Sequence, residues 1–112
     1  MRDTLLYVED ILEAIEKIKR YTEGMDFEDF VVDEKTVDAV IRNLEIIGET
    51  VKNLPEEFKA MHPDLPWREI AGMRDRLFHA YFGVDLSIVW YTIKNDLDEI
   101  EFRLKSIMEG QK

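Results

Sequence analysis

The fold is decided by residues 33–54, which read DEKTVDAVIRNLEIIGETVKNL. Apolar side chains recur in this stretch every three or four positions, at Val37, Val40, Ile41, Leu44, Ile47, Val51 and Leu54. This spacing is typical of an amphipathic helix with one buried face. Because Asp33 suits a helix cap and Pro55 cannot continue a helix, we predict one long helix between these two residues.

Three further segments show the same helical period, at about residues 3–22, 66–81 and 85–108. Shorter helical turns are expected at 27–31 and from residue 55 onward. Four long amphipathic helices joined by short links predict an all-α fold, an antiparallel four-helix bundle with short additional helices. The chain has 112 residues and shows no internal linker, so we expect one domain over its whole length, residues 1–112.

The beginning of the last predicted helix is apolar over more of its circumference than the interior of one bundle requires. Ile88, Trp90, Tyr91 and Ile93 follow one another closely there, and Trp90 and Tyr91 cannot point the same way on a helix. One of these aromatic residues would then lie on a subunit interface, and we expect a homodimer. The alternative is that this half of the helix is simply well buried.

The composition excludes several classes of protein. The chain has no cysteine, so it forms neither disulfides nor thiolate metal sites. It has no signal-peptide pattern and no apolar run of bilayer length, so we expect a cytoplasmic protein without membrane contact. The net charge of −10 disfavours non-specific binding of nucleic acid. Residues 59–83 are different, because four basic and three acidic side chains give them a charge of +1.

Within that stretch, the residues that could do chemistry gather between Gly72 and Gly83. They suggest metal-free cleavage of a phosphodiester, with the neighbouring ribose 2′-hydroxyl of RNA as the nucleophile. The expected site residues are Arg74, which would stabilise charge on the phosphate oxygens; His79, a general base or acid near neutral pH; Arg76, which would bind a flanking phosphate; Asp75, which would orient a group across an interface; and Tyr81, which would position the phosphate or accept a modification. No metal and no cofactor are expected, since the two histidines lack the spacing and companions of metal ligands.

One regular helix cannot aim all of these groups at one point. Counting about 100° per residue, Arg74 and Tyr81 share a face, whereas His79 lies about 140° from Arg74. Either the helix loosens before Gly83, or residues from two subunits meet across a twofold axis. The simpler reading is that Arg74 and His79 are a solvated charge and a helix end, and that His62, before a proline, is a turn residue.

The order of these residues is also that of a known motif, Arg, four residues, His, one residue, Tyr, which reads RDRLFHAY at 74–81. Together with NLEIIGE at 43–49, PWREIAGM at 66–73 and FGVD at 82–85, it resembles the HepT branch of the HEPN superfamily. The resemblance implies a homodimer of helical bundles with a composite site between the protomers. It also implies a metal-independent endoribonuclease toxin of a toxin–antitoxin module, whose partner is a minimal nucleotidyltransferase antitoxin.

Carried over to this chain, the resemblance makes Arg74 and His79 the catalytic pair and Tyr81 the residue to which the partner attaches AMP. Asp75 stands where asparagine is frequent in such motifs, and Ala80 where glycine is common. The competing hypothesis is a non-catalytic subunit of a nucleotidyltransferase complex that binds a nucleotide or the partner. Cleavage of RNA distinguishes the two.

Overall fold

The computed structural model describes residues 3–73 and 86–110. Every element within these residues is helical, which confirms the predicted all-α class. In chain order the elements are α1 (Thr4–Thr22), α2 (Phe27–Val31), α3 (Glu34–Asn53), α4 (Glu56–Met61), α5 (Trp67–Ala71), α7 (Leu86–Tyr91), the π-helical turn η1 (Thr92–Asp96) and α8 (Leu97–Gly110).

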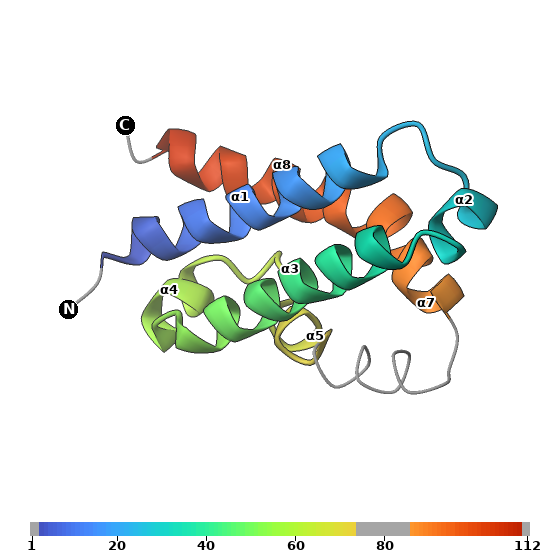
Figure 1. The fold of residues 1–112 in the computed structure, drawn as a ribbon. Helices are drawn as coiled ribbons and strands as arrows, with labels where there is room; N and C mark the ends of the chain where they lie inside the picture. The colour runs from blue at the N-terminus through green and yellow to red at the C-terminus, as the bar shows by residue number, and fades with distance from the viewer. Residues whose placement is uncertain (1–2, 74–85, 111–112) are drawn as a thin grey trace.

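The long helices lie along one axis, with α1 antiparallel to both α3 and α8 (Figure 1). Helix α1 packs against α3 on one side and α8 on the other, and α5 packs against α3. The short helix α2 turns the chain from α1 into α3 and contacts α7 at the same end of the bundle. The second half of the long helix predicted at residues 66–81, from residue 74 onward, lies outside the described residues.

Local signals set the helix ends where the sequence places them. The Asp3 carboxylate accepts a hydrogen bond from the Leu5 amide at 3.0 Å, and the Asp33 carboxylate accepts one from the Thr36 amide at 3.1 Å. Both aspartates thus cap orphan amides at a helix start. Helix α3 ends at Asn53, one residue before Leu54 and two before Pro55. The predicted helices at residues 3–22 and 33–54 are confirmed.

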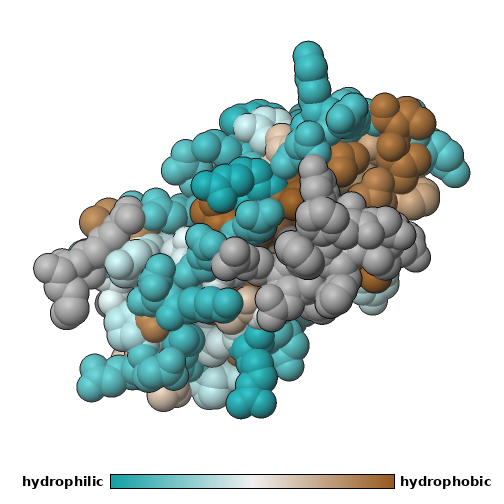
Figure 2. Space-filling model, turned by 60° about the horizontal axis from the view of Figure 1, so that its bottom comes forward, coloured by the Kyte–Doolittle hydropathy of each residue, from teal (hydrophilic) through white to brown (hydrophobic). Residues whose placement is uncertain are grey.

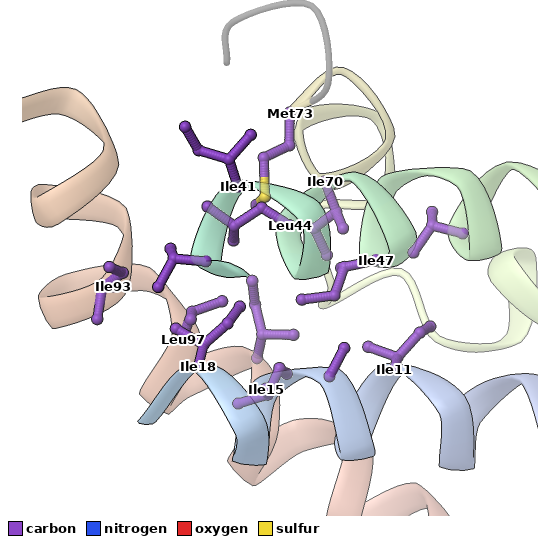
Figure 3. Close-up of a cluster of buried hydrophobic side chains, with 14 of the residues drawn as sticks. Ile11, Ile15, Ile18, Ile41, Leu44, Ile47, Ile70, Met73, Ile93 and Leu97 are labelled. Carbon is purple, nitrogen blue, oxygen red and sulfur yellow. The ribbon is translucent and has the colours of Figure 1, made fainter. Parts of the chain in front are cut away.

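The core lies between α1 and α3 and is closed by the segments before and after residues 74–85. Figure 3 shows apolar side chains of α1, α3 and the last helix meeting in one cluster, with Ile70 and Met73 covering it at the top of the view. Its labelled members are buried: Ile11, Ile15, Ile18, Ile41, Leu44, Ile47, Ile70, Met73, Ile93 and Leu97. This cluster fixes α5 and η1 relative to the two long helices.

A charged group also ties α8 to α1. The Lys19 ammonium on α1 forms an ion pair with Asp98 and another, at 2.7 Å, with Glu101 on α8. Partial burial disfavours the charged ammonium, but the hydrogen bonds to the two carboxylates outweigh it and raise the pKa of Lys19 above its ordinary value. In the part of the chain that the structure describes, no helix is long and apolar enough to cross a membrane.

Gly24, directly after α1, is the one place in the described chain where the backbone has a positive φ, at 78°. A side chain here would meet no atom within 4 Å, so a substitution is penalised only by the backbone conformation. We expect Gly24→Ala to lower the free energy of unfolding by about 1 kcal/mol, measured by urea denaturation. Gly110→Ala, which also meets no atom within 4 Å and has no positive φ, is the control and should not lower the free energy of unfolding. Equal stability of the two variants would contradict this account.

Candidate functional site

The five site residues expected from the sequence, Arg74, Asp75, Arg76, His79 and Tyr81, all lie outside the described residues. The structure therefore bears on the site through the elements that precede and follow residues 74–85. These are the turn between α4 and α5, helix α5 with Met73, and the helix that begins at Leu86.

The turn before α5 is held by an aromatic cluster. The indole nitrogen of Trp67 donates to the backbone oxygens of His62, at 2.9 Å, and Lys59, at 3.1 Å. The Phe58 ring packs against the rings of both His62 and Trp67, with centroid distances of 4.8 and 6.0 Å. His62 is thus a turn residue at the end of α4, as predicted. These contacts fix where α5 begins.

Helix α5 and Met73, which lead to residue 74, are anchored by buried side chains. Ile70 and Met73 are both buried and point toward Ile41 and Leu44 of α3 (Figure 3). The prediction of one unbroken helix from Pro66 is wrong at Gly72, because α5 ends at Ala71 and Gly72 forms a turn. The Gly72 amide still donates to the Arg68 oxygen at 2.9 Å, as it would in a helix. A Cβ at Gly72 would lie 3.3 Å from that same oxygen, so the tight turn favours glycine. The buried Met73 side chain therefore anchors the chain directly before Arg74.

The chain re-enters the described structure at α7, which is anchored in the same way. Val89 is buried, and the Trp90 ring packs on Phe30, at a centroid distance of 5.1 Å, and on Phe27, at 6.3 Å. The neighbouring Tyr91 points away from this cluster and is 62% exposed. The prediction that Trp90 and Tyr91 point in different directions is confirmed.

An apolar surface lies at this end of the molecule. Ile88 on α7 is 42% exposed, and Val32, directly after α2, is 82% exposed. Figure 2 shows apolar atoms gathered at the right-hand end, beside the grey segment, where α2 and α7 lie in Figure 1. We call Val32, Ile88 and Tyr91 the α2/α7 patch. The alternative that the first half of the last helix is simply well buried does not hold for Ile88 and Tyr91.

The last helix contains a wide turn that the sequence analysis did not predict. Between α7 and α8, residues Thr92–Asp96 form the π-helical turn η1, whose hydrogen bonds skip one residue more than those of an α-helix. The Thr92 hydroxyl donates to the Ile88 oxygen and the Asn95 amide to the Tyr91 oxygen, each at 3.0 Å. These polar side chains lie beside the carbonyls that the wide turn rearranges, and they are the only sequence signal for it.

A cleft of about 370 Å³ opens beside Met73, between α5 and α8. Its floor is formed by buried apolar residues, among them Leu65, Ile70 and Met73. Its charged lining consists of four carboxylates and one guanidinium, those of Asp64, Glu69, Asp96, Glu99 and Arg103. We call this site the acidic cleft.

The guanidinium in the acidic cleft is already engaged. Arg103 donates to Asp64 at 2.7 Å and to Glu99 at 3.0 Å, and the hydrogen bonds to Glu99 and then Asp64 raise its pKa above the ordinary value. With four carboxylates against one cation, the formal charge of the lining is −3. Such a surface repels phosphates, so the described walls beside residue 74 add no phosphate-binding group.

The residues of the acidic cleft were not predicted as a site, although their spacing in the sequence carries part of the signal. Asp96, Glu99 and Arg103 are spaced by three and four residues and so share one face of a helix. Asp64 and Glu69 belong to a distant stretch and reach that face only through the fold. Elsewhere, on α3, Arg42 and Glu45 form an ion pair with 3.8 Å between the charged groups. Across the described residues, no group of three or more histidine, aspartate or glutamate side chains is arranged to hold a metal ion.

Comparison with known proteins gives consistent matches. The family model described as Ribonuclease HepT-like matches residues 11–107. A protein of Thermococcus cleftensis named probable ribonuclease HepT is 54% identical over 101 residues, which are 90% of this chain and 92% of that protein. A candidate RNase of Caldanaerobacter subterraneus subsp. tengcongensis is 49% identical over 106 residues, 95% of either chain. No solved structure matches significantly.

Proposed function

The chain belongs to the ribonuclease HepT-like family, and we propose that it is an endoribonuclease that cleaves RNA without a metal ion. One observation carries the proposal: the matched region, residues 11–107, contains Arg74, His79 and Tyr81 in the order and spacing of the motif. The names of the relatives support it, because they are given as ribonucleases and match over nearly their whole length.

In this mechanism the 2′-hydroxyl of a ribose attacks the adjacent phosphorus. His79 takes the proton of that hydroxyl as general base, and Arg74 stabilises the negative charge that grows on the phosphate oxygens. The bond from phosphorus to the 5′-oxygen breaks, and this oxygen takes up a proton from an imidazolium. The products are a 2′,3′-cyclic phosphate and a 5′-hydroxyl end, so every atom is accounted for without water or metal.

The other three expected site residues bind or position the RNA substrate in this proposal. Arg76 holds a flanking phosphate, Asp75 orients a group across the subunit boundary, and Tyr81 positions the phosphate. Tyr81 is also the residue that a minimal nucleotidyltransferase antitoxin modifies with AMP, which would block the site and neutralise a toxin. We place this toxin and its antitoxin in the cytoplasm, where its RNA substrate is found.

The proposed site is composite and lies between the two protomers of a homodimer. The α2/α7 patch supports this arrangement, because a monomer leaves Ile88 and Tyr91 exposed a few residues after the motif. Exposed aromatic and aliphatic residues of this kind are typical of an interface core. A twofold axis beside the patch would bring two copies of residues 74–81 together, which also resolves the 140° between Arg74 and His79 on one helix.

We expect the double substitution Ile88→Ser and Tyr91→Ser to raise the dimer dissociation constant at least about 30-fold, since a buried aromatic anchor contributes about 2 kcal/mol or more. Sedimentation equilibrium measures the constant, and RNA cleavage at low protein concentration should fall with the dimer fraction. Leu6→Ser removes an aliphatic side chain of comparable exposure, 44%, from α1 and is the control. A double variant that stays dimeric would exclude the α2/α7 patch as the interface.

The test of the proposed function is RNA cleavage by the purified protein in excess EDTA. Cleavage that persists in EDTA and leaves a 2′,3′-cyclic phosphate is the expected result. If EDTA abolishes cleavage, or if the products carry 5′-phosphates, the mechanism above is wrong. Variants of Arg74 and His79 identify the groups responsible for cleavage.

The acidic cleft favours a second function, that of a non-catalytic subunit of a nucleotidyltransferase complex. Its formal charge of −3 lies directly beside Met73, where an RNA backbone would have to approach residue 74. A protein partner meets no such penalty. In this case the purified dimer binds its partner or a nucleotide but leaves RNA intact under all conditions.

A further inference from the structure

A second hollow continues the acidic cleft along α8. It has a volume of about 330 Å³ and shares Asp64 and Arg103 with the cleft, so the Arg103–Asp64 ion pair forms the boundary between the two. The second hollow is lined on α8 by Phe102, Ser106 and Ile107 and on the opposite side by His62. We call the two hollows together the α8 groove.

The α8 groove has an apolar end and an acidic end. Phe102 is 70% exposed in the second hollow, and Met61, next to His62 in the sequence, is also 70% exposed. The His62 Nε2 atom is buried and has no hydrogen-bond partner among the described residues. At the other end, Asp96 and Glu99 line the acidic cleft. A matching ligand therefore combines an apolar side chain with positive charges on one side of it.

The charge also decides what kind of molecule fits. The lining of the acidic cleft repels the phosphates of RNA, because it carries a formal charge of −3. A second copy of the chain is disfavoured too, since a twofold contact would place the same acidic residues against each other. A basic segment of a different protein can make favourable contacts at both ends of the groove, apolar contacts at one and charge pairs at the other.

We propose that the α8 groove docks a basic segment of a partner protein, whose apolar side chain packs on Phe102 while its lysine or arginine side chains face Asp96 and Glu99. The direction of the segment is fixed by this polarity. Its basic end lies in the acidic cleft beside Met73, and its apolar end lies near the end of α8. The described residues that line the α8 groove include none of the motif residues and none of the α2/α7 patch.

The probe is a fluorescein-labelled peptide of sequence KKLKKFKK, titrated with the full-length protein and followed by fluorescence anisotropy. Amide shifts in nitrogen-15 NMR spectra locate the peptide on the protein. We expect binding that weakens with salt, shifts confined to residues 62–73 and 96–110 within the described chain, and at least tenfold weaker binding to Phe102→Ser. The pair Asp96→Asn and Glu99→Gln should lose at least as much. The peptides KKSKKSKK and EELEEFEE should bind at least tenfold more weakly than the probe.

Matched controls separate docking from general charge attraction. Val32→Ser removes an exposed aliphatic side chain from the α2/α7 patch, outside the α8 groove. Glu28→Gln with Asp38→Asn removes two negative charges from α2 and α3, as many as the Asp96 and Glu99 pair removes from the groove. Equal losses of peptide affinity in these control variants overturn the proposal, as does binding of KKSKKSKK as tightly as the probe. Binding of a single-stranded RNA octamer that depends on Phe102 also overturns it. So does a dimer that Phe102→Ser dissociates. Phe102→Ser should retain RNA cleavage and its far-ultraviolet circular dichroism, because the side chain is 70% exposed. A failure of docking is thereby distinguishable from a failure of the proposed nuclease.

Discussion

Purified His79→Ala protein is expected to cleave RNA about 100- to 10,000-fold more slowly than the unsubstituted protein, because it lacks the group that moves the proton. Arg74→Ala should lower the rate about 100- to 1,000-fold, since a single group that stabilises transition-state charge contributes that much. The measurement is the single-turnover rate on a labelled RNA in EDTA. Helical content, measured by circular dichroism, should stay unchanged in both variants.

The chain contains its own control for this experiment. Its only other histidine, His62, lies in the turn after α4 with its ring on Phe58, so His62→Ala should retain cleavage under conditions where it is folded. Arg42→Ala on the exposed side of α3 is the control for Arg74. If His79→Ala and Arg74→Ala both cleave RNA as fast as these controls, the catalytic assignment is wrong even if the protein is a nuclease.

The largest expected effect on stability is that of Leu44→Ala. Leu44 is fully buried in the middle of α3, and the surrounding side chains come from α1, the segment before residue 74 and the last helix (Figure 3). Removing three carbon atoms there leaves a cavity that this packing cannot close fully, and we expect a loss of about 2–5 kcal/mol in the free energy of unfolding. Urea denaturation followed by circular dichroism measures it.

Leu6→Ala on α1 is the matched control, because Leu6 has the same side chain but is 44% exposed. It should cost less than about 1 kcal/mol, since most of its apolar surface stays in contact with water in the folded protein. A loss of less than about 1 kcal/mol in Leu44→Ala would mean that α3 is not the centre of the core.

The sequence was sufficient for the parts of the fold that depend on local signals. The period of apolar residues located α1 and α3, and Asp3, Asp33, Gly24 and Pro55 marked their ends. These signals act within one or two turns of the chain, so no knowledge of distant contacts was needed. The opposite directions of Trp90 and Tyr91 follow from helical geometry alone.

The features that were missed depend on competition between local preference and packing. The turn at Gly72 and the wide turn η1 interrupt segments whose apolar period is continuous, so the period gives no signal for either turn. The acidic cleft joins residues of α8 to residues some thirty positions earlier in the chain. Helical periodicity relates only residues within a few turns, so it cannot predict this contact. The motif at 74–81 was found by its order of residues and not by geometry, and its catalytic roles stay a prediction.

The wide turn η1 has a consequence for how the chain tolerates changes in length. A turn closed over five residues instead of four accommodates one residue more, which equals about 100° of helical rotation. Trp90 on one side of this turn and Leu97 on the other both pack on the core, so their relative phase depends on the additional residue. Excising a single amino acid between them would turn α7 away from Phe27 and Phe30 while leaving α8 on α1. The number of residues in the last helix is therefore constrained. An uninterrupted α-helix of the same apolar composition could not place both Trp90 and Leu97 on the core.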